Sequence, residues 1–246
     1  MSHPHPALPD HRPLIVAHRT GNSVKTAALA IRRGADMLEA DIWRYQRRLE
    51  IRHLKTMGPV PLLWDRWMLA PGWTRRLELD DLLDATPVNT RIMLDLKGHD
   101  PMLAPAIVMS IRDRQPERAI IMCTRYWGHL DRVKDDANVY RIYSIGSEQE
   151  RATVWSRLES MEHPAVSIHR ELMTPSIARR FADLGVTVLV WSVNTRDEAR
   201  LMLDLGADGL TVSDGPVENW LLSQQQRTGG HPSGSATLRI GGTDDS

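Results

Sequence analysis

The sequence predicts an α/β fold in which eight parallel strands close into a single-domain (β/α)8, or TIM, barrel. Three observations predict it: eight short apolar runs, helical patterns in most of the gaps between them, and a length of 246 residues that suits one undivided barrel. An open doubly wound sheet is the alternative. No glycine-rich phosphate loop follows the first run to favour it.

The eight expected strands are short apolar runs, most of them containing β-branched residues. They span residues 14–17, 37–42, 91–96, 119–123, 139–145, 165–168, 186–191 and 208–212. Strands that alternate with helices form right-handed parallel units, and eight such units close a barrel. We therefore expect an active site at the carboxyl ends of these strands.

The helical patterns carry start and stop signals. The expected helices are SVKTAALAIRRG (23–34), PMLAPAIVMSIRDRQ (101–115), SEQERATVWSRLES (147–160), TPSIARRFADLG (174–185) and TRDEARLMLDLG (195–206). Gly34, Gly185 and Gly206 stand where C-terminal caps belong, and Ser147 and Thr195 stand at N-cap positions.

The regular alternation is interrupted by an irregular insertion between the second and third strands. Within residues 43–90 we expect an extra strand at 48–53, a Trp- and Pro-rich loop, and a short helix at 77–85. The two ends, 1–12 and 226–246, have little to bury, so they are expected to be flexible around a barrel spanning 13–225.

Composition excludes several classes of protein. Because the formal net charge is zero, a nucleic-acid partner is not expected, and an anionic ligand would be held by a few local cations. Cys123 is the single cysteine, which excludes an intrachain disulfide and suits a reducing compartment. The sequence shows neither a signal peptide nor a run long enough to span a membrane, so a cytoplasmic location is expected.

Acidic side chains lie at two expected strand ends. Glu39 and Asp41 are two residues apart, so they point to the same face of their strand. Asp95 follows at the end of the third strand. Buried carboxylates on one face repel one another unless a cation compensates them. Solvent-exposed acids are the alternative for the first two, but the three together predict one hard divalent cation, Mg²⁺ or Ca²⁺.

Two histidines and two cations flank these acids. His18 and Arg19 end the first strand, and His53 closes the extra strand. Histidine titrates near neutrality, so the two imidazoles suit acid–base catalysis, whereas Arg19 and Lys97 suit contact with an anion. Trp191, at the end of the seventh run, is either a core residue or a wall of the ligand pocket.

One further histidine and three further basic residues are weaker candidates for ligand contact. His169, after the sixth strand, is either a further ligand contact or a structural histidine. Arg44, Arg52 and Lys55, near His53, are either additions to an anion site or ordinary solvated charges.

The motifs AHR, GADMLEADIW, IRH, LDLK and VLVWSVNT…LGADGLTVSDGP, in this order over about residues 13–222, resemble the glycerophosphodiester phosphodiesterase family. The resemblance implies a TIM barrel that hydrolyses glycerophosphodiesters to glycerol 3-phosphate and an alcohol with the help of a divalent cation. It also implies roles for individual residues. By that resemblance the catalytic histidines are His18 and His53, in either order as acid and base; the metal ligands are Glu39, Asp41 and Asp95; Arg19 and Lys97 contact phosphate; and Trp191 lines the alcohol side.

The sequence departs from the family pattern at four positions. Thr20 stands where a glycine is usual, and Lys25 lies in the segment that normally supplies an acidic residue. Leu54 follows His53 in place of an aspartate, and Asp95 is one methylene shorter than the usual glutamate.

Two alternatives remain open at this stage. A phospholipase D or lysophospholipase D of the sphingomyelinase D-like type would share the catalytic set and act on a lysophospholipid. The segment LLWDRWMLAPGW (62–73) would then make peripheral membrane contact. A non-catalytic barrel is the second alternative, suggested by Leu54 and Lys25.

Overall fold

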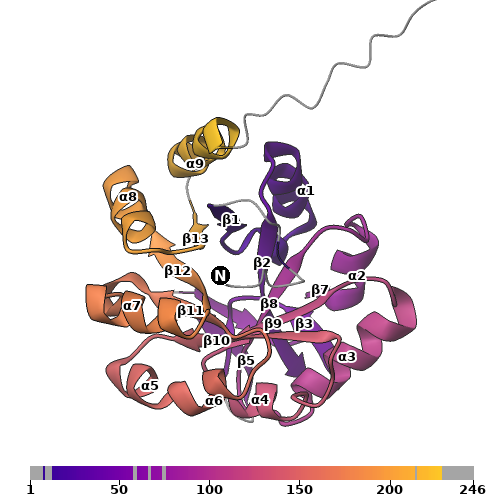
Figure 1. Cartoon of the computed structure of the whole chain (residues 1–246). Coiled ribbons are helices and arrows are strands. Elements are labelled where there is room, and N and C mark those ends of the chain that lie inside the picture. Colours follow the sequence, from indigo (N-terminus) through magenta and orange to yellow (C-terminus); the bar gives the residue numbers. More distant parts are fainter. Residues whose placement is uncertain are drawn as a thin grey trace, which may run out of the picture.

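In the computed structural model, which describes residues 8, 13–57, 60–65, 68–73, 76–213 and 215–228, eight parallel strands form a closed barrel with helices around it (Figure 1). The strands are β1 (Leu14–Ala17), β2 (Met37–Tyr45), β8 (Ile92–Leu96), β9 (Ile120–Thr124), β10 (Val139–Ile145), β11 (Ala165–His169), β12 (Thr187–Val193) and β13 (Gly209–Val212). Because β1 pairs with both β13 and β2, the sheet closes on itself. The predicted fold class is confirmed, and all eight predicted runs begin within one residue of a strand.

Helices follow the barrel strands and lie around the outside of the barrel (Figure 1). They are α1 (Val24–Arg33), α2 (Leu79–Asp84), α3 (Leu103–Arg114), α4 (Gly128–Asp131), α5 (Glu148–Thr153), α6 (Trp155–Glu159), α7 (Pro175–Asp183), α8 (Arg196–Asp204) and α9 (Gly215–Thr228), with the short 3-10 helices η1 (Thr20–Asn22) and η2 (Arg170–Leu172). The predicted helix at 147–160 is divided into α5 and α6 at Val154. Helices α4 and α9 were not predicted, and α9 continues three residues past the expected end of the barrel.

The predicted caps are confirmed. Gly34, Gly185 and Gly206 all adopt positive φ angles, as the end of a helix requires. The side chains of Ser147 and Thr195 accept hydrogen bonds from backbone N–H groups in the first turns of α5 and α8.

The insertion between β2 and β8 is more regular than predicted. Strand β3 (Arg48–Ile51) extends the barrel sheet antiparallel to β2, and β7 (Leu77–Glu78) pairs antiparallel with β3. Strands β4 (Lys55–Met57), β5 (Val60–Asp65) and β6 (Met68–Pro71) form a separate antiparallel sheet. The expectation of a loop over most of 62–73 is therefore wrong. The Trp and Pro residues obscured the strand pattern, yet Pro71 fits because it ends an edge strand, where no ladder N–H is needed.

Side chains of the barrel strands alternate between two buried clusters. The cluster between the strands and the helices includes Ile15, Leu38 and Leu94. The cluster inside the barrel contains Leu14, Val16, Met37, Met93, Ile121, Cys123, Ile142, Ala165 and Leu189. Since alternate residues share a face, the inner row of each strand continues two residues at a time toward its carboxyl end. Among the described residues, no helix is both long and apolar enough to cross a membrane.

Candidate active site

The inner rows of three neighbouring strands change from apolar to charged at the mouth of the barrel. In β1, Leu14 and Val16 are followed by His18; in β2, Met37 is followed by Glu39 and Asp41. The next strand, β8, continues in the same way. A cavity of about 630 Å³ opens here, and the lining residues include His18, Arg19, Glu39, Asp41, Asp95, Lys97 and Trp191. The expected position of the site is thus occupied by the expected side chains.

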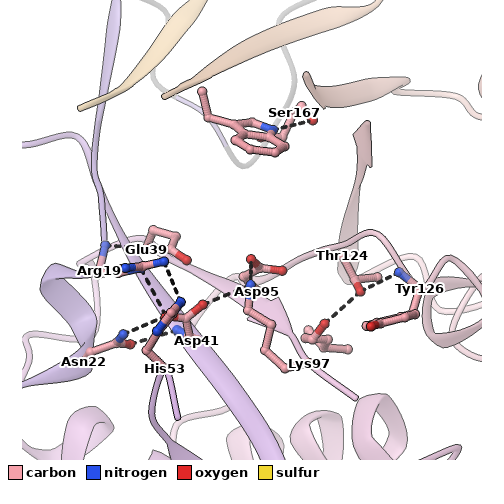
Figure 2. A network of polar contacts seen from close by, with 12 residues as sticks. Arg19, Asn22, Glu39, Asp41, His53, Asp95, Lys97, Thr124, Tyr126 and Ser167 are labelled. Carbon is pink, nitrogen blue, oxygen red and sulfur yellow. Dashed lines mark hydrogen bonds and ion pairs between the residues drawn. The ribbon is translucent and has the colours of Figure 1, made fainter. Parts of the chain in front are cut away.

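Three carboxylates converge at one side of this cavity. Glu39, Asp41 and Asp95 each offer one oxygen, and the three oxygens lie within 4.8 Å of one another (Figure 2). The register explains the convergence, because Asp41 of β2 lies directly opposite Asp95 of β8. Glu39 and Asp41 are buried, and Asp95 is half-buried.

Asp41 is the most firmly held of the three acids. Its Oδ1 accepts from the ammonium group of Lys97 at 2.9 Å, and Lys97 also bonds Asp95. The Asn22 amide donates to Asp41 Oδ2 and accepts from the Asp41 backbone N–H, both at 2.8 Å. Burial alone would raise the pKa of Asp41, but Lys97 and the Asn22 hydrogen bond lower it below its ordinary value.

Burial and the crowding of the three acids raise the pKa values of the other two carboxylates. Burial, together with the charges of Asp41 and Asp95, raises the pKa of Glu39 well above its ordinary value. Burial also raises the pKa of Asp95, although Lys97 opposes that shift. One ammonium group therefore does not neutralise three acids. An oxygen-only donor set with this excess of negative charge fits a hard divalent cation.

His18 projects into the cavity from the end of β1. Its Nδ1 lies 2.7 Å from the hydroxyl oxygen of Ser213, which follows β13. Burial and the neighbouring positive charge of Arg19 lower the pKa of His18 to about 4. The imidazole is therefore neutral at neutral pH and able to accept a proton.

Arg19 links the acids to the second histidine (Figure 2). The backbone of Arg19 is left-handed, with φ 55°, and its N–H donates to Glu39 Oε2 at 2.5 Å. The guanidinium donates to His53 Nε2 at 2.6 Å and lies 3.7 Å from Asp41 Oδ2. Since a guanidinium has no acceptor, His53 Nε2 must be the acceptor. Of these two residues, Arg19 is among those that line the cavity and His53 is not.

Trp191 forms part of the opposite wall. Its indole N–H donates to the backbone carbonyl of Ser167 at 3.0 Å, which fixes the ring at the mouth. His169 packs edge-on against this ring with 4.9 Å between centroids, and it is not among the residues that line the cavity.

The three cations near His53 have different surroundings. Lys55 lines the cavity. Arg44 instead pairs with Asp100 at 2.7 Å, and Arg52 forms a buried pair with Glu50 at 2.8 Å. Of the three, only Lys55 is placed to meet a ligand in the cavity described here.

The departures from the family pattern fall outside the acid cluster, apart from Asp95 itself. The Thr20 hydroxyl donates to the carbonyl of Ala17 at 2.9 Å, and Lys25 is exposed on α1. Leu54 is buried, and its carbonyl accepts from the guanidinium of Arg52. His53 thus has Arg19 as a partner where the family pattern would supply an adjacent aspartate.

Several polar residues at the cavity were missed from the sequence. Asn22 and Ser213 hold Asp41 and His18, and Arg125 and Tyr126 line the cavity after β9. Each of the four directly follows a barrel strand or lies in the short turn after one. That position could have identified them as cavity residues from the sequence.

Comparison with known proteins gives a consistent result. The model of the "Glycerophosphoryl diester phosphodiesterase family" matches residues 60–216, more than half of the chain. A search of curated proteins found no significant match. The matched range includes Asp95, Lys97 and Trp191 but begins after His18, Glu39 and Asp41, so the case for the latter three depends on geometry.

Solved structures share the fold at low sequence identity. A protein from Silicibacter pomeroyi, named "Putative glycerophosphoryl diester phosphodiesterase", is 15% identical with a TM-score of 0.70, covering 88% of this chain and 95% of that one. A phosphodiesterase from Oleispira antarctica, in complex with the product sn-glycerol-3-phosphate, is 15% identical with a TM-score of 0.68, covering 86% and 96%. The enzyme from Thermotoga maritima is 14% identical with a TM-score of 0.65, covering 88% and 100%.

Proposed function

Since the chain belongs to the glycerophosphoryl diester phosphodiesterase family, we propose that it hydrolyses glycerophosphodiesters to glycerol 3-phosphate and an alcohol with the help of a divalent cation. One observation carries the proposal: three carboxylates, a lysine and a neutral histidine converge at the mouth of the barrel. In barrels of this kind the active site forms at the carboxyl ends of the strands.

Glu39, Asp41 and Asp95 are the residues that would hold the cation. Their oxygens suit Mg²⁺ or Ca²⁺, and the raised pKa values of Glu39 and Asp95 indicate a deficit of positive charge that the cation would relieve. When bound, a divalent ion stabilises the negative charge that develops on the phosphoryl oxygens.

The remaining roles belong to side chains of this protein. Lys97 and Arg19 bind and orient the phosphodiester, because both line the cavity and both carry a charge next to the acids. His18 takes the proton from the nucleophile, since its lowered pKa keeps it neutral. His53 would supply a proton to the departing alcohol, which requires that its Nε2 leave the Arg19 guanidinium and take up a proton first.

Chelation tests the metal requirement. We expect EDTA to reduce hydrolysis of glycerophosphocholine to background, because the three acids then repel the substrate phosphate instead of holding a cation. Adding Mg²⁺ or Ca²⁺ in excess should restore the activity, and glycerol 3-phosphate should be the phosphorylated product. Full activity in the chelator would exclude the metal, and choline phosphate as the product would exclude this class of hydrolysis.

A lysophospholipid substrate is the second candidate, favoured by a row of side chains on the small sheet. Lys55 lies at the cavity, Trp64 is its direct partner on β5, and Leu69 is the direct partner of Trp64 on β6. Direct cross-strand partners share a face. Trp64 is 38% exposed and Leu69 is 67% exposed, so the row leads from the cavity rim to an apolar surface that suits an acyl chain.

The Leu69→Ser variant tests this candidate. If acyl chains lie along the row, the variant should lower kcat/KM for lysophosphatidylcholine by roughly threefold to tenfold, as the loss of a partly buried aliphatic contact predicts, and leave glycerophosphocholine unaffected. Met109→Ser is the matched control, because Met109 is 70% exposed and lies on α3. Equal rates of the wild type and Leu69→Ser on the lipid would reject the row as an acyl site.

A further inference from the structure

Arg125 extends the inner row of β9 into the cavity. Ile121 and Cys123 of that row lie inside the barrel, and Arg125 follows two residues later at the mouth. The register pairs Cys123 with Asp95, and Arg125 and Lys97 each follow two residues later, just past the ends of β9 and β8. Besides Arg19, Lys55 and Lys97, the cavity thus has a further cation one strand away from the acid cluster.

The position of this guanidinium is fixed from two sides. Its Nε donates to both oxygens of Glu150, at 2.9 and 3.2 Å, and Glu150 is itself held by the backbone N–H of Gly146 at 2.6 Å. The plane of the guanidinium also lies against Gly146, where a Cβ would come within 2.9 Å of Arg125 Cζ. A side chain at position 146 would displace the guanidinium from this position.

The terminal nitrogens of Arg125 have no such partner. Among the residues that the structure describes, its hydrogen bonds all start from Nε, so both terminal NH₂ groups retain their donors. The Arg125 side chain is 49% exposed while that of Glu150 is 19% exposed. The carboxylate therefore acts as a clamp that leaves the terminal NH₂ groups as donors, and Arg125 and Glu150 both line the cavity.

From this geometry we propose that Arg125 binds an anionic group on the alcohol of the substrate, so that the preferred diesters carry a negative charge beyond the phosphodiester. The inference rests on the proposed function. A phosphodiester held by Lys97 and Arg19 has two substituents, and a substituent that extends toward β9 meets Arg125, because all three cations line the same cavity. Of the two substituents, glycerol carries no charge. A charged group that Arg125 binds must therefore belong to the other substituent, the alcohol. A carboxylate and a terminal phosphate both fit the fork.

Two matched substrates test the proposal: esters of glycerol 3-phosphate with 3-hydroxypropionate and with 3-hydroxypropionamide, which differ in charge but hardly in size. We expect the wild type to prefer the carboxylate ester by roughly tenfold to hundredfold in kcat/KM, mainly through KM, as a hydrogen bond to a charged group predicts. A third ester, whose alcohol is glycerol bearing a terminal phosphate, shows which anion is preferred.

The Arg125→Gln variant should abolish the preference by slowing only the charged esters. Arg112→Gln is the matched control and should retain it, because Arg112 is 46% exposed and pairs with Asp136 on the outside of the barrel. Equal losses on the charged and neutral esters would overturn the proposal and place Arg125 at the phosphodiester. A wild type that hydrolyses both esters equally would also overturn it, with the proposed function intact. If the wild type hydrolyses none of these esters and does not hydrolyse glycerophosphocholine either, the proposed function and this inference are rejected together.

Discussion

The Glu39→Gln variant is expected to lose divalent-cation binding and to show a kcat/KM about a thousandfold lower, since the ion supplies several kcal/mol of charge stabilisation in the transition state. Glutamine keeps the size of Glu39 and can still accept the Arg19 N–H, so the backbone around η1 should not change. The loss would then come from the missing negative charge. Hydrolysis of glycerophosphocholine and isothermal titration with Mg²⁺ or Ca²⁺ measure the two effects separately.

The effect of Glu39→Gln on thermal stability should depend on whether the cation is present. In chelator, the raised pKa of Glu39 means that the folded protein holds a proton that the unfolded chain releases near the ordinary value of 4.5. Glu39 therefore destabilises the metal-free protein increasingly as pH rises from that value through its folded pKa. Glu39→Gln removes this loss, so it should melt at the same temperature as the wild type or higher at neutral pH in chelator.

With the cation added, the wild type should instead melt at a higher temperature than Glu39→Gln. At a concentration about a hundredfold above Kd, binding adds about 3 kcal/mol, or roughly 5–10 °C in Tm for a domain of this size, to the wild type alone. Glu218→Gln is the matched control, because Glu218 is also buried with a raised pKa but pairs with Arg33 on the outside of the barrel. A Glu39→Gln variant that the cation still stabilises fully would contradict the assignment of Glu39 as a ligand.

The fold and the acid cluster were predictable because both follow from periodicity along single strands. Glu39 and Asp41 share a face whatever their partners, and Asp95 ends a neighbouring apolar run. Parallel strands bring their carboxyl ends to one edge, so three local patterns were enough to predict a shared site.

Contacts made between turns were not predictable in this way. The pairing of Arg19 with His53 depends on the left-handed backbone at Arg19 and on the hairpin that carries His53. Arg125 was missed because its clamp comes from Glu150, on a helix 25 residues further along the chain. The sheet that contains Trp64 was missed because its hairpins are held by local pairing and not by a long apolar run.

The second large effect is expected for His18→Asn. Asparagine retains a polar atom near the place of Nδ1 and so keeps the contact with Ser213, but it lacks the other ring nitrogen. General acid–base catalysis is typically worth about 10²–10⁴ in rate, and a base with a pKa of about 4 is a weak one, so we expect a loss in kcat of about 10²–10³. Divalent-cation binding should remain unchanged.

The leaving group distinguishes a base from an acid. If His18 takes the proton from the nucleophile, His18→Asn should slow glycerophosphocholine and the p-nitrophenyl ester of glycerol 3-phosphate by the same factor, because both need an activated nucleophile. If His18 instead protonates the leaving group, p-nitrophenolate needs no proton and its ester should be spared. His163→Asn is the control, since His163 lies just before β11 at the far end of the barrel, and it should leave both rates unchanged. Sparing of the p-nitrophenyl ester would exchange the roles of His18 and His53.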